Sequence, residues 1–173
     1  MKFRLATEKD ANSVSDLVNS VYRGETGMKS WTTEAGFIGG QRTDPQSISE
    51  IIKRPKNFIV ISVNEKGETV GSVHLEIQNE KCYLGMLTVD WRIQQAGLGS
   101  RILQEAERFA REELKIDTMT MNVITIRSEL VEWYRKRGYV DTGIRRPFPY
   151  GDEKFGLPKV QGLEFMILDK KLR

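Results

Sequence analysis

The chain has 173 residues, 39% of them hydrophobic and 29% charged, and a formal net charge of +3 at pH 7. These values fit one soluble globular domain over residues 1–173, and the basic residues are too scattered for a nucleic-acid-binding stripe. No apolar run approaches the roughly 18 residues of a membrane span, and a single cysteine, Cys82, excludes an internal disulfide, so we expect a cytoplasmic protein that binds neither nucleic acid nor a membrane.

The first half of the chain predicts one strand, two helices and three further strands. Residues 2–5 alternate as a half-buried strand does, and apolar residues at helical spacing predict a helix over 8–22, with a capping box starting at Thr7. Asp44 and Pro45 begin a short helix. Strands follow at 58–63, 70–77 and 82–89, and the short links between them make this β-meander antiparallel.

The second half predicts alternating helices and strands. Apolar residues from Leu98 to Leu114 recur every three or four positions and predict an amphipathic helix. A strand over 118–123 precedes a helix over 128–136 that Gly138 ends, and the last strands are expected at 139–144 and 162–168. This order of elements predicts an α/β (α+β) fold with a mixed sheet.

Two long segments, 24–44 and 147–159, show no regular period. Loops of this length inside a compact domain are usually functional or disordered. Between them they hold the aromatic residues Trp31, Phe37, Phe148 and Tyr150 and the acidic residues Glu34, Asp44, Asp152 and Glu153. These side chains suit a pocket for an amine, and they equally suit the closing of the loops onto the sheet.

Glycines between a strand and an amphipathic helix indicate an anion site. Gly97 and Gly99 let a phosphate approach the unpaired N–H groups of residues 95–100 at the positive end of the helix dipole. The same pattern also occurs in plain strand-to-helix turns. A P-loop is excluded because Gly-Ser-Arg replaces Gly-Lys-Ser/Thr, and a dinucleotide fingerprint is excluded because Ile102 stands at its third glycine.

Two motifs resemble those of the GNAT superfamily of N-acetyltransferases. Residues 87–99 are similar to its coenzyme signature, Gln/Arg-x-x-Gly-x-Gly/Ala, and residues 130–139 resemble its second motif, a helix ending in Tyr-x-x-x-Gly-Phe/Tyr. The resemblance covers essentially the whole chain. The chain departs from the family pattern at Arg127, where an asparagine is frequent, and after Val89, where a proline is usual.

The resemblance implies a twisted, mainly antiparallel sheet of about seven strands flanked by about four helices. It also implies acetyl-CoA as the acyl donor, no metal, a small-molecule or peptide amine as acceptor, and a monomer or homodimer. The coenzyme-binding residues that it implies are Leu87, Thr88, Val89, Gln94, Gln95, Ala96, Gly97, Leu98, Gly99 and Ser100.

For catalysis, the resemblance implies a backbone oxyanion donor at 87–89 and Tyr134 as the acid that protonates the leaving thiolate. Tyr134 also fits a plain core position. The base that must deprotonate the amine is not evident: Glu34, His74 and Glu76 are candidates, with Glu34 first because its loop lies where the family lines the acceptor site. Cys82 starts a buried strand and is rejected as a nucleophile.

Two other functions remain compatible with the sequence. One is a transferase that uses another acyl-CoA or a hydroxyl acceptor. The other is a GNAT-like module that binds acyl-CoA as a sensor without turnover.

Overall fold

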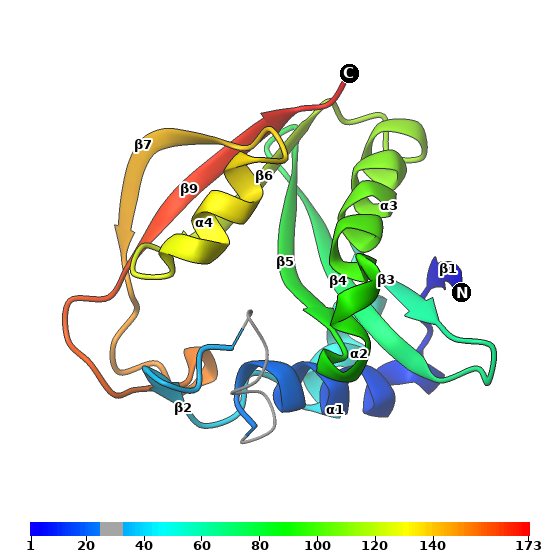
Figure 1. The fold of residues 1–173 in the computed structure, drawn as a ribbon, viewed down its shortest axis with the longest axis horizontal. Helices are drawn as coiled ribbons and strands as arrows, with labels where there is room; N and C mark the ends of the chain where they lie inside the picture. Colours follow the sequence, from blue (N-terminus) through cyan, green and yellow to red (C-terminus); the bar gives the residue numbers. More distant parts are fainter. Residues whose placement is uncertain (25–32) are drawn as a thin grey trace.

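The computed structural model describes residues 1–24 and 33–173, without the side chains of Gln94, Gln95, Ala96 and Phe155. Within this part of the chain, seven strands form one twisted sheet in the order β1-β3-β4-β5-β6-β9-β7 (Figure 1). The strands are β1 (Lys2–Leu5), β3 (Asn57–Val63), β4 (Thr69–Gln78), β5 (Lys81–Val89), β6 (Thr118–Ile124), β7 (Val140–Pro147) and β9 (Glu164–Lys171). The predicted mixed, mainly antiparallel fold is confirmed, since only the β5–β6 pair of this sheet is parallel.

Four α-helices in the described residues flank the sheet: α1 (Ala11–Tyr22), α2 (Pro45–Lys53), α3 (Leu98–Glu112) and α4 (Ser128–Arg135). Each begins near its predicted position. Thr7 N–H donates to Asp10 Oδ2 at 2.7 Å, completing the expected capping box, although one turn of 3-10 helix, Glu8–Asp10, precedes α1. Asp44 caps α2 by accepting the Ser47 N–H at 2.7 Å.

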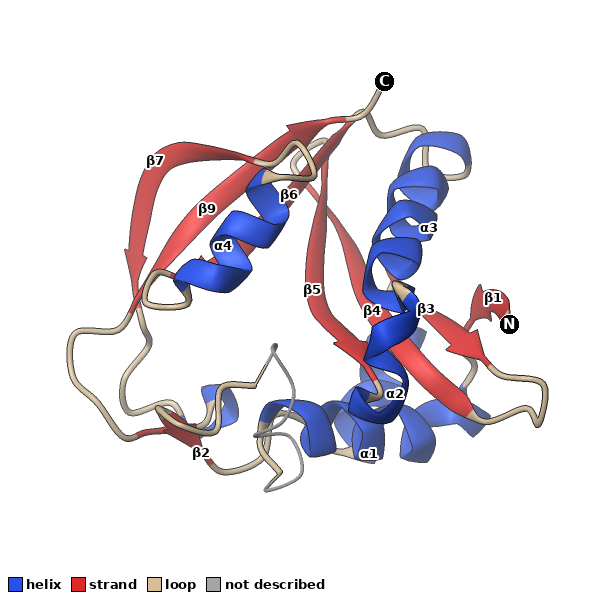
Figure 2. Cartoon of the chain, viewed as in Figure 1, coloured by secondary structure: helices blue, strands red, loops and turns tan. Residues whose placement is uncertain are grey.

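The helices cover opposite faces of the sheet because side chains alternate along each strand. Ile59 and Ile61 of β3 pack with α1 and α2, whereas Val60 packs in the larger cluster with α3 and α4. Figure 2 shows α3 and α4 on the near side of the strands. Gly71 lets α3 approach β4 closely, since a Cβ there would lie 2.2 Å from Ile102 Cδ1.

Strands β5 and β6 form a fork. They pair in parallel only at Cys82↔Met119 and Tyr83↔Thr120, and residues 84–89 have no register partner on β6. Figure 1 shows the two strands diverging toward the N-terminal end of α3. Met86 has a φ of +48°, and the β4–β5 register shifts opposite it, so a bulge turns β5 away from β6. Residues 87–89, where the family resemblance implies a backbone oxyanion donor, therefore lie on the part of β5 that has separated from β6.

Four short elements were not expected from the sequence. A 3-10 helix, Trp91–Ala96, fills most of the predicted loop between β5 and α3. Strand β2 (Ile38–Gly39) pairs with β8 (Leu157–Pro158), and the 3-10 helix Glu153–Phe155 lies just before β8. This small second sheet joins the two irregular segments of the sequence. No helix in the described residues combines the length and apolar character needed to cross a membrane.

Candidate active site

The glycine loop has the backbone geometry of an anion site. Gly97 adopts the left-handed conformation, with a φ of +66°, and α3 starts at the next residue. A Cβ at Gly97 would meet no atom within 4 Å, so the backbone is open to an approaching ligand. The N–H groups of Leu98, Gly99 and Ser100 lie in the first helical turn, where they have no partner within the helix.

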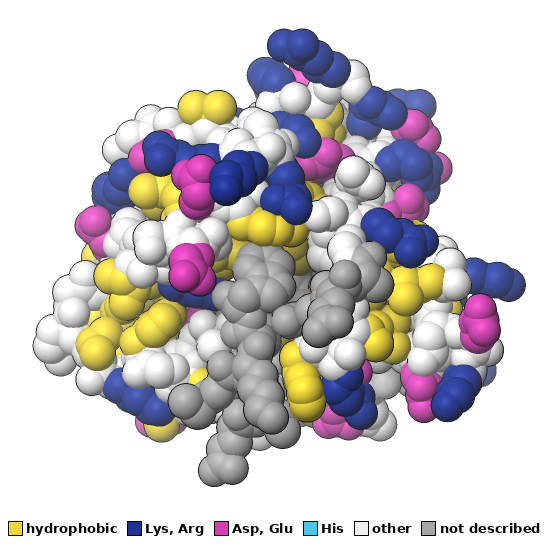
Figure 3. Space-filling view, viewed as in Figure 1, with side chains coloured by type: hydrophobic (Ala, Val, Ile, Leu, Met, Phe, Trp, Pro, Cys, Tyr) yellow, Lys and Arg dark blue, Asp and Glu magenta, His cyan; other side chains and the backbone are white. Residues whose placement is uncertain are grey.

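A cation that the sequence analysis did not single out lies beside this loop. The Arg137 guanidinium donates to Ser100 Oγ at 2.6 Å and stacks on the Trp133 ring, 3.6 Å from its centroid. Arg137 belongs to the basic cluster at 135–137 and lies just after α4, which ends at Arg135. On the face shown in Figure 3, Lys and Arg side chains lie over α4 and α3, interspersed with Asp and Glu.

A pocket of about 150 Å³ lies in the fork between β5 and β6. Its lining includes Tyr22, Glu34, Arg127 and Tyr134 together with both strands. Tyr134 is buried, and its ring makes edge contacts with Trp133 and Tyr139 at 5.0 and 5.6 Å. Burial raises the pKa of Tyr134, so the hydroxyl keeps its proton at neutral pH. Such a group can donate a proton and cannot serve as a base.

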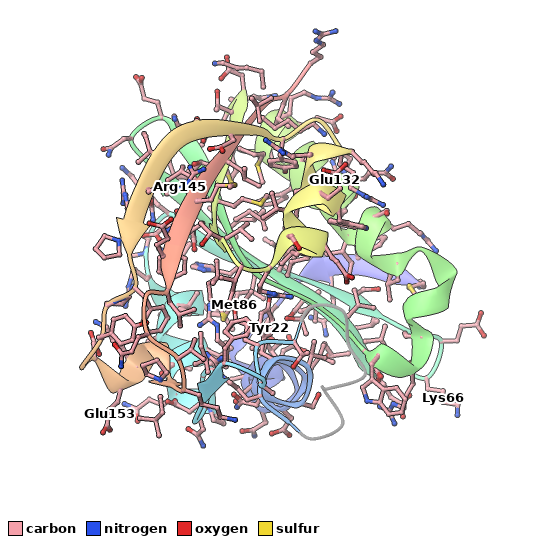
Figure 4. All side chains as sticks on the ribbon, turned by 60° about the vertical axis from the view of Figure 1, so that its left-hand side comes forward. Tyr22, Lys66, Met86, Glu132, Arg145 and Glu153 are labelled. Atoms are coloured by element: carbon pink, nitrogen blue, oxygen red, sulfur yellow. The ribbon has the colours of Figure 1, made fainter. Side chains whose placement is uncertain are left out.

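Tyr22, the last residue of α1, holds the bulged segment of β5 in place. Its hydroxyl donates to the Leu87 carbonyl at 2.9 Å, and burial raises its pKa to about 12. Thr88 Oγ1 donates to the Met86 carbonyl at 2.8 Å. In Figure 4, Tyr22 and Met86 lie close together near the centre of the molecule. Together, these bonds hold residues 86–88 in position.

Glu34 lies in the same fork pocket and is held by two arginines. Its Oε2 accepts from Arg23 at 2.8 Å, and its Oε1 lies 3.7 Å from Arg127 Nη1. All three side chains are largely buried. Arg127, at the family's frequent asparagine position, thus contacts a residue of the first irregular segment.

A groove of about 940 Å³ lies on the α1–α2 face of the sheet. Loops 40–44 and 153–157 and strands β4 to β7 line it, with His74 and Glu76 among its residues. His74 Nε2 lies 2.8 Å from Asn57 Oδ1, and burial lowers the pKa of this histidine to about 4. The structure therefore separates the candidate bases, since Glu34 lies in the fork pocket and the other two lie in the groove.

The groove and the fork pocket meet. Five residues line both of them: Arg42, Tyr83, Gly85, Met86 and Asn122. We call this set the junction.

The aromatic side chains expected in the acceptor pocket have mostly structural contacts. Phe37 and Phe148 pack around Ile38 in a small core, and the Tyr150 hydroxyl donates to the Val160 carbonyl at 2.9 Å. Trp31 lies outside the described residues.

Among the acidic residues expected there, Asp44 caps α2 and Asp152 lies 3.4 Å from Lys154 Nζ. Glu153 lines the groove.

Cys82 is buried, and burial raises the pKa of its thiol to about 12. A thiol in this state is a poor nucleophile, in agreement with its rejection from the sequence. In the part of the chain that the structure describes, no cluster of three His, Cys, Asp or Glu side chains is placed to hold a metal ion.

Comparison with known proteins agrees with this geometry. Residues 29–148 match the family model of the acetyltransferase (GNAT) domain. A search of curated proteins found no match.

Several solved structures share the fold at low sequence identity. A ribosomal-protein-alanine N-acetyltransferase from Brucella melitensis has a TM-score of 0.73 at 18% identity, with 99% of this chain and 100% of that chain covered. A spermidine N-acetyltransferase chimera that includes Vibrio cholerae sequence has a TM-score of 0.69 at 11% identity, covering 99% and 96%. An acetyltransferase from Bacillus anthracis, solved with acetyl coenzyme A, has a TM-score of 0.58 at 19% identity, covering 71% and 66%.

Proposed function

The chain belongs to the GNAT family of acetyltransferases, and we propose that it moves the acetyl group of acetyl-CoA directly to an amine acceptor. The observation that carries this proposal is the meeting of two cavities at the fork. The fork pocket and the separate groove share the junction, four of whose five residues lie on β5 and β6. Direct transfer requires two such approaches to one carbon atom.

The coenzyme pyrophosphate would bind the backbone of the glycine loop. Gln94 to Ser100 supply N–H groups at the positive end of the α3 dipole, and the Arg137 guanidinium beside Ser100 adds a positive charge. The pantetheine arm would then enter the fork along Leu87, Thr88 and Val89, which lack partners on β6.

The transfer step uses groups that line the fork. The neutral amine attacks the thioester carbon, and a backbone N–H of residues 87–89 stabilises the oxyanion. As the C–N bond forms and the C–S bond breaks, Tyr134 gives its proton to the leaving sulfur. The position of Tyr134 in the pocket supports this role, and burial keeps its hydroxyl protonated at neutral pH by raising its pKa.

We propose Glu34 as the group that takes the proton from the amine, directly or through water. Among the described residues that line the fork pocket, it carries the only carboxylate. A carboxylate can act as a general base toward an amine. Arg23 and Arg127 fix its orientation.

Calorimetric titration with acetyl-CoA, desulfo-CoA and NAD tests the coenzyme site, and thiol release over a panel of amines tests the reaction. We expect both CoA compounds to bind and NAD not to bind, because NAD lacks the pantetheine arm that enters the fork. Binding followed by thiol release with one class of amine supports the transferase. Binding without release across the panel would favour a sensor, and no binding would refute the assignment of the glycine loop.

A further inference from the structure

The junction carries one charged side chain. Of its five residues, only Arg42 is ionised at neutral pH, and Tyr83, Gly85, Met86 and Asn122 are not. Any amine that passes from the groove to the fork must bring its reacting end close to this guanidinium. The charge of Arg42 therefore selects among possible acceptors.

Within residues 1–24 and 33–173, the Arg42 side chain is not committed to an ion pair. None of the ion pairs between described residues includes Arg42, nor Arg54 or Arg146 farther along the groove. The Arg42 backbone N–H donates to Asn19 Oδ1 at 2.8 Å, so the loop is anchored independently of the side chain. The guanidinium carbon lies 5.8 Å from the centroid of the Tyr22 ring.

Two of the three carboxylates that line the groove, Asp44 and Glu76, accept hydrogen bonds within the protein. Both oxygens of Asp44 bind Ser47, to its N–H at 2.7 Å and to its Oγ at 3.0 Å. Glu76 accepts the Gln78 side-chain amide at 2.7 Å. Beyond the junction, Glu34 is paired with Arg23. Among the five junction residues, Arg42 alone carries a charge, and that charge is positive.

We propose that the acceptor is an amine with a carboxylate a few bonds from the reacting nitrogen, as in an α-amino acid, and that Arg42 binds this carboxylate. This inference rests on the proposed transferase function and narrows its substrate class. The guanidinium presents two parallel donors that match the two oxygens of a carboxylate. A polyamine would bring a second ammonium group to the junction in place of a carboxylate, and the positive charge of Arg42 would repel it.

Binding of matched probes tests the inference without requiring turnover. Saturation-transfer NMR would compare glutamate, methionine and phenylalanine with their carboxamides and with spermidine, in the presence of desulfo-CoA. We expect at least one amino acid to bind about 10- to 100-fold more tightly than its carboxamide. A hydrogen bond between two charged groups typically changes a dissociation constant by about this factor. Thiol release from acetyl-CoA should show the same preference in kcat/KM.

Arg42→Gln should abolish the preference for the carboxylate. Arg54→Gln is the matched control, because it removes the same charge from the same groove outside the junction, and it should keep most of the preference. Unchanged melting temperatures and acetyl-CoA affinities would show that both variants are folded.

Four results would overturn the inference: equal binding of amides or spermidine, a preference that survives Arg42→Gln, an equal loss in Arg54→Gln, or no binding of any amino acid. A failure of the transferase function has a different signature. Acetyl-CoA would then not bind or would release no thiol with any amine, whatever the probes show.

Discussion

Replacing Gly97 by alanine should weaken acetyl-CoA binding far more than it weakens the fold. The left-handed backbone at this position, with a φ of +66°, costs an L-residue about 1–2 kcal/mol. For a protein of this size, that corresponds to a fall in melting temperature of about 2–8 °C. The new Cβ meets no protein atom within 4 Å, so no packing is disturbed.

The effect on the coenzyme has a separate cause. The Cβ would occupy the space through which a phosphate approaches the N–H groups at the start of α3. Loss of one charge-assisted hydrogen bond is worth about 1.5–3 kcal/mol, so the dissociation constant of acetyl-CoA should rise about 10- to 100-fold.

Gly143→Ala is the matched control for this substitution. Gly143 lies on the outer strand β7, has a φ of +81°, and likewise has open space where the methyl group of an alanine would lie. Calorimetric titration with acetyl-CoA and thermal unfolding would be measured for both variants. We expect similar losses of stability and a loss of affinity only for Gly97→Ala. Equal affinities in the two variants would show that the glycine loop does not bind the coenzyme.

Three further substitutions test the roles of single side chains. Tyr134→Phe should lower kcat about 10²- to 10⁴-fold by removing the acid, with acetyl-CoA affinity unchanged; full turnover would refute the role. Glu34→Gln should lower kcat/KM by removing the base while acetyl-CoA affinity stays unchanged, and full turnover would assign the proton to another base. His74→Gln should reduce the acid sensitivity of the fold. Burial, helped by Arg42 and Arg54 and opposed by Glu76, lowers the His74 pKa from 6.5 to about 4, so the unfolded state binds more protons between these values. Urea unfolding of the wild type should therefore lose about 1–2 kcal/mol between pH 7 and pH 5, and an equal loss in the variant would exclude His74 as the cause.

Regular elements could be predicted because their signals are local. The α3 pattern repeats over four turns, and the strands of the meander combine β-branched residues with short links. The 3-10 helix at Trp91–Ala96 gave no such signal, since it spans six residues. The β2–β8 sheet joins Ile38 to Pro158, so each two-residue strand depends on a partner that only the folded chain brings near.

In the candidate site too, residues within local motifs could be predicted from the sequence, and contacts between distant residues could not. Gly97, Gly99 and Tyr134 fall within motifs, so sequence alone could locate them. Arg137 and Ser100 are 37 residues apart, and Tyr22 bonds a carbonyl 65 residues away. Neither contact has a signature along the chain, because the surrounding sheet and helices bring the partners together.

The charge of the acceptor site shows why composition alone is a poor guide to specificity. The two irregular segments contain several carboxylates, which suggest an acidic pocket for an amine. In the folded chain, Asp44 caps α2 and Glu34 pairs with Arg23, so part of each negative charge is balanced within the protein. An arginine without such a partner keeps its full charge, and among the described residues Arg42 has this position at the junction. Because the sign of the field at the reacting centre depends on which side chains are paired, it follows from the contacts of the folded protein and not from the number of acidic residues in its loops.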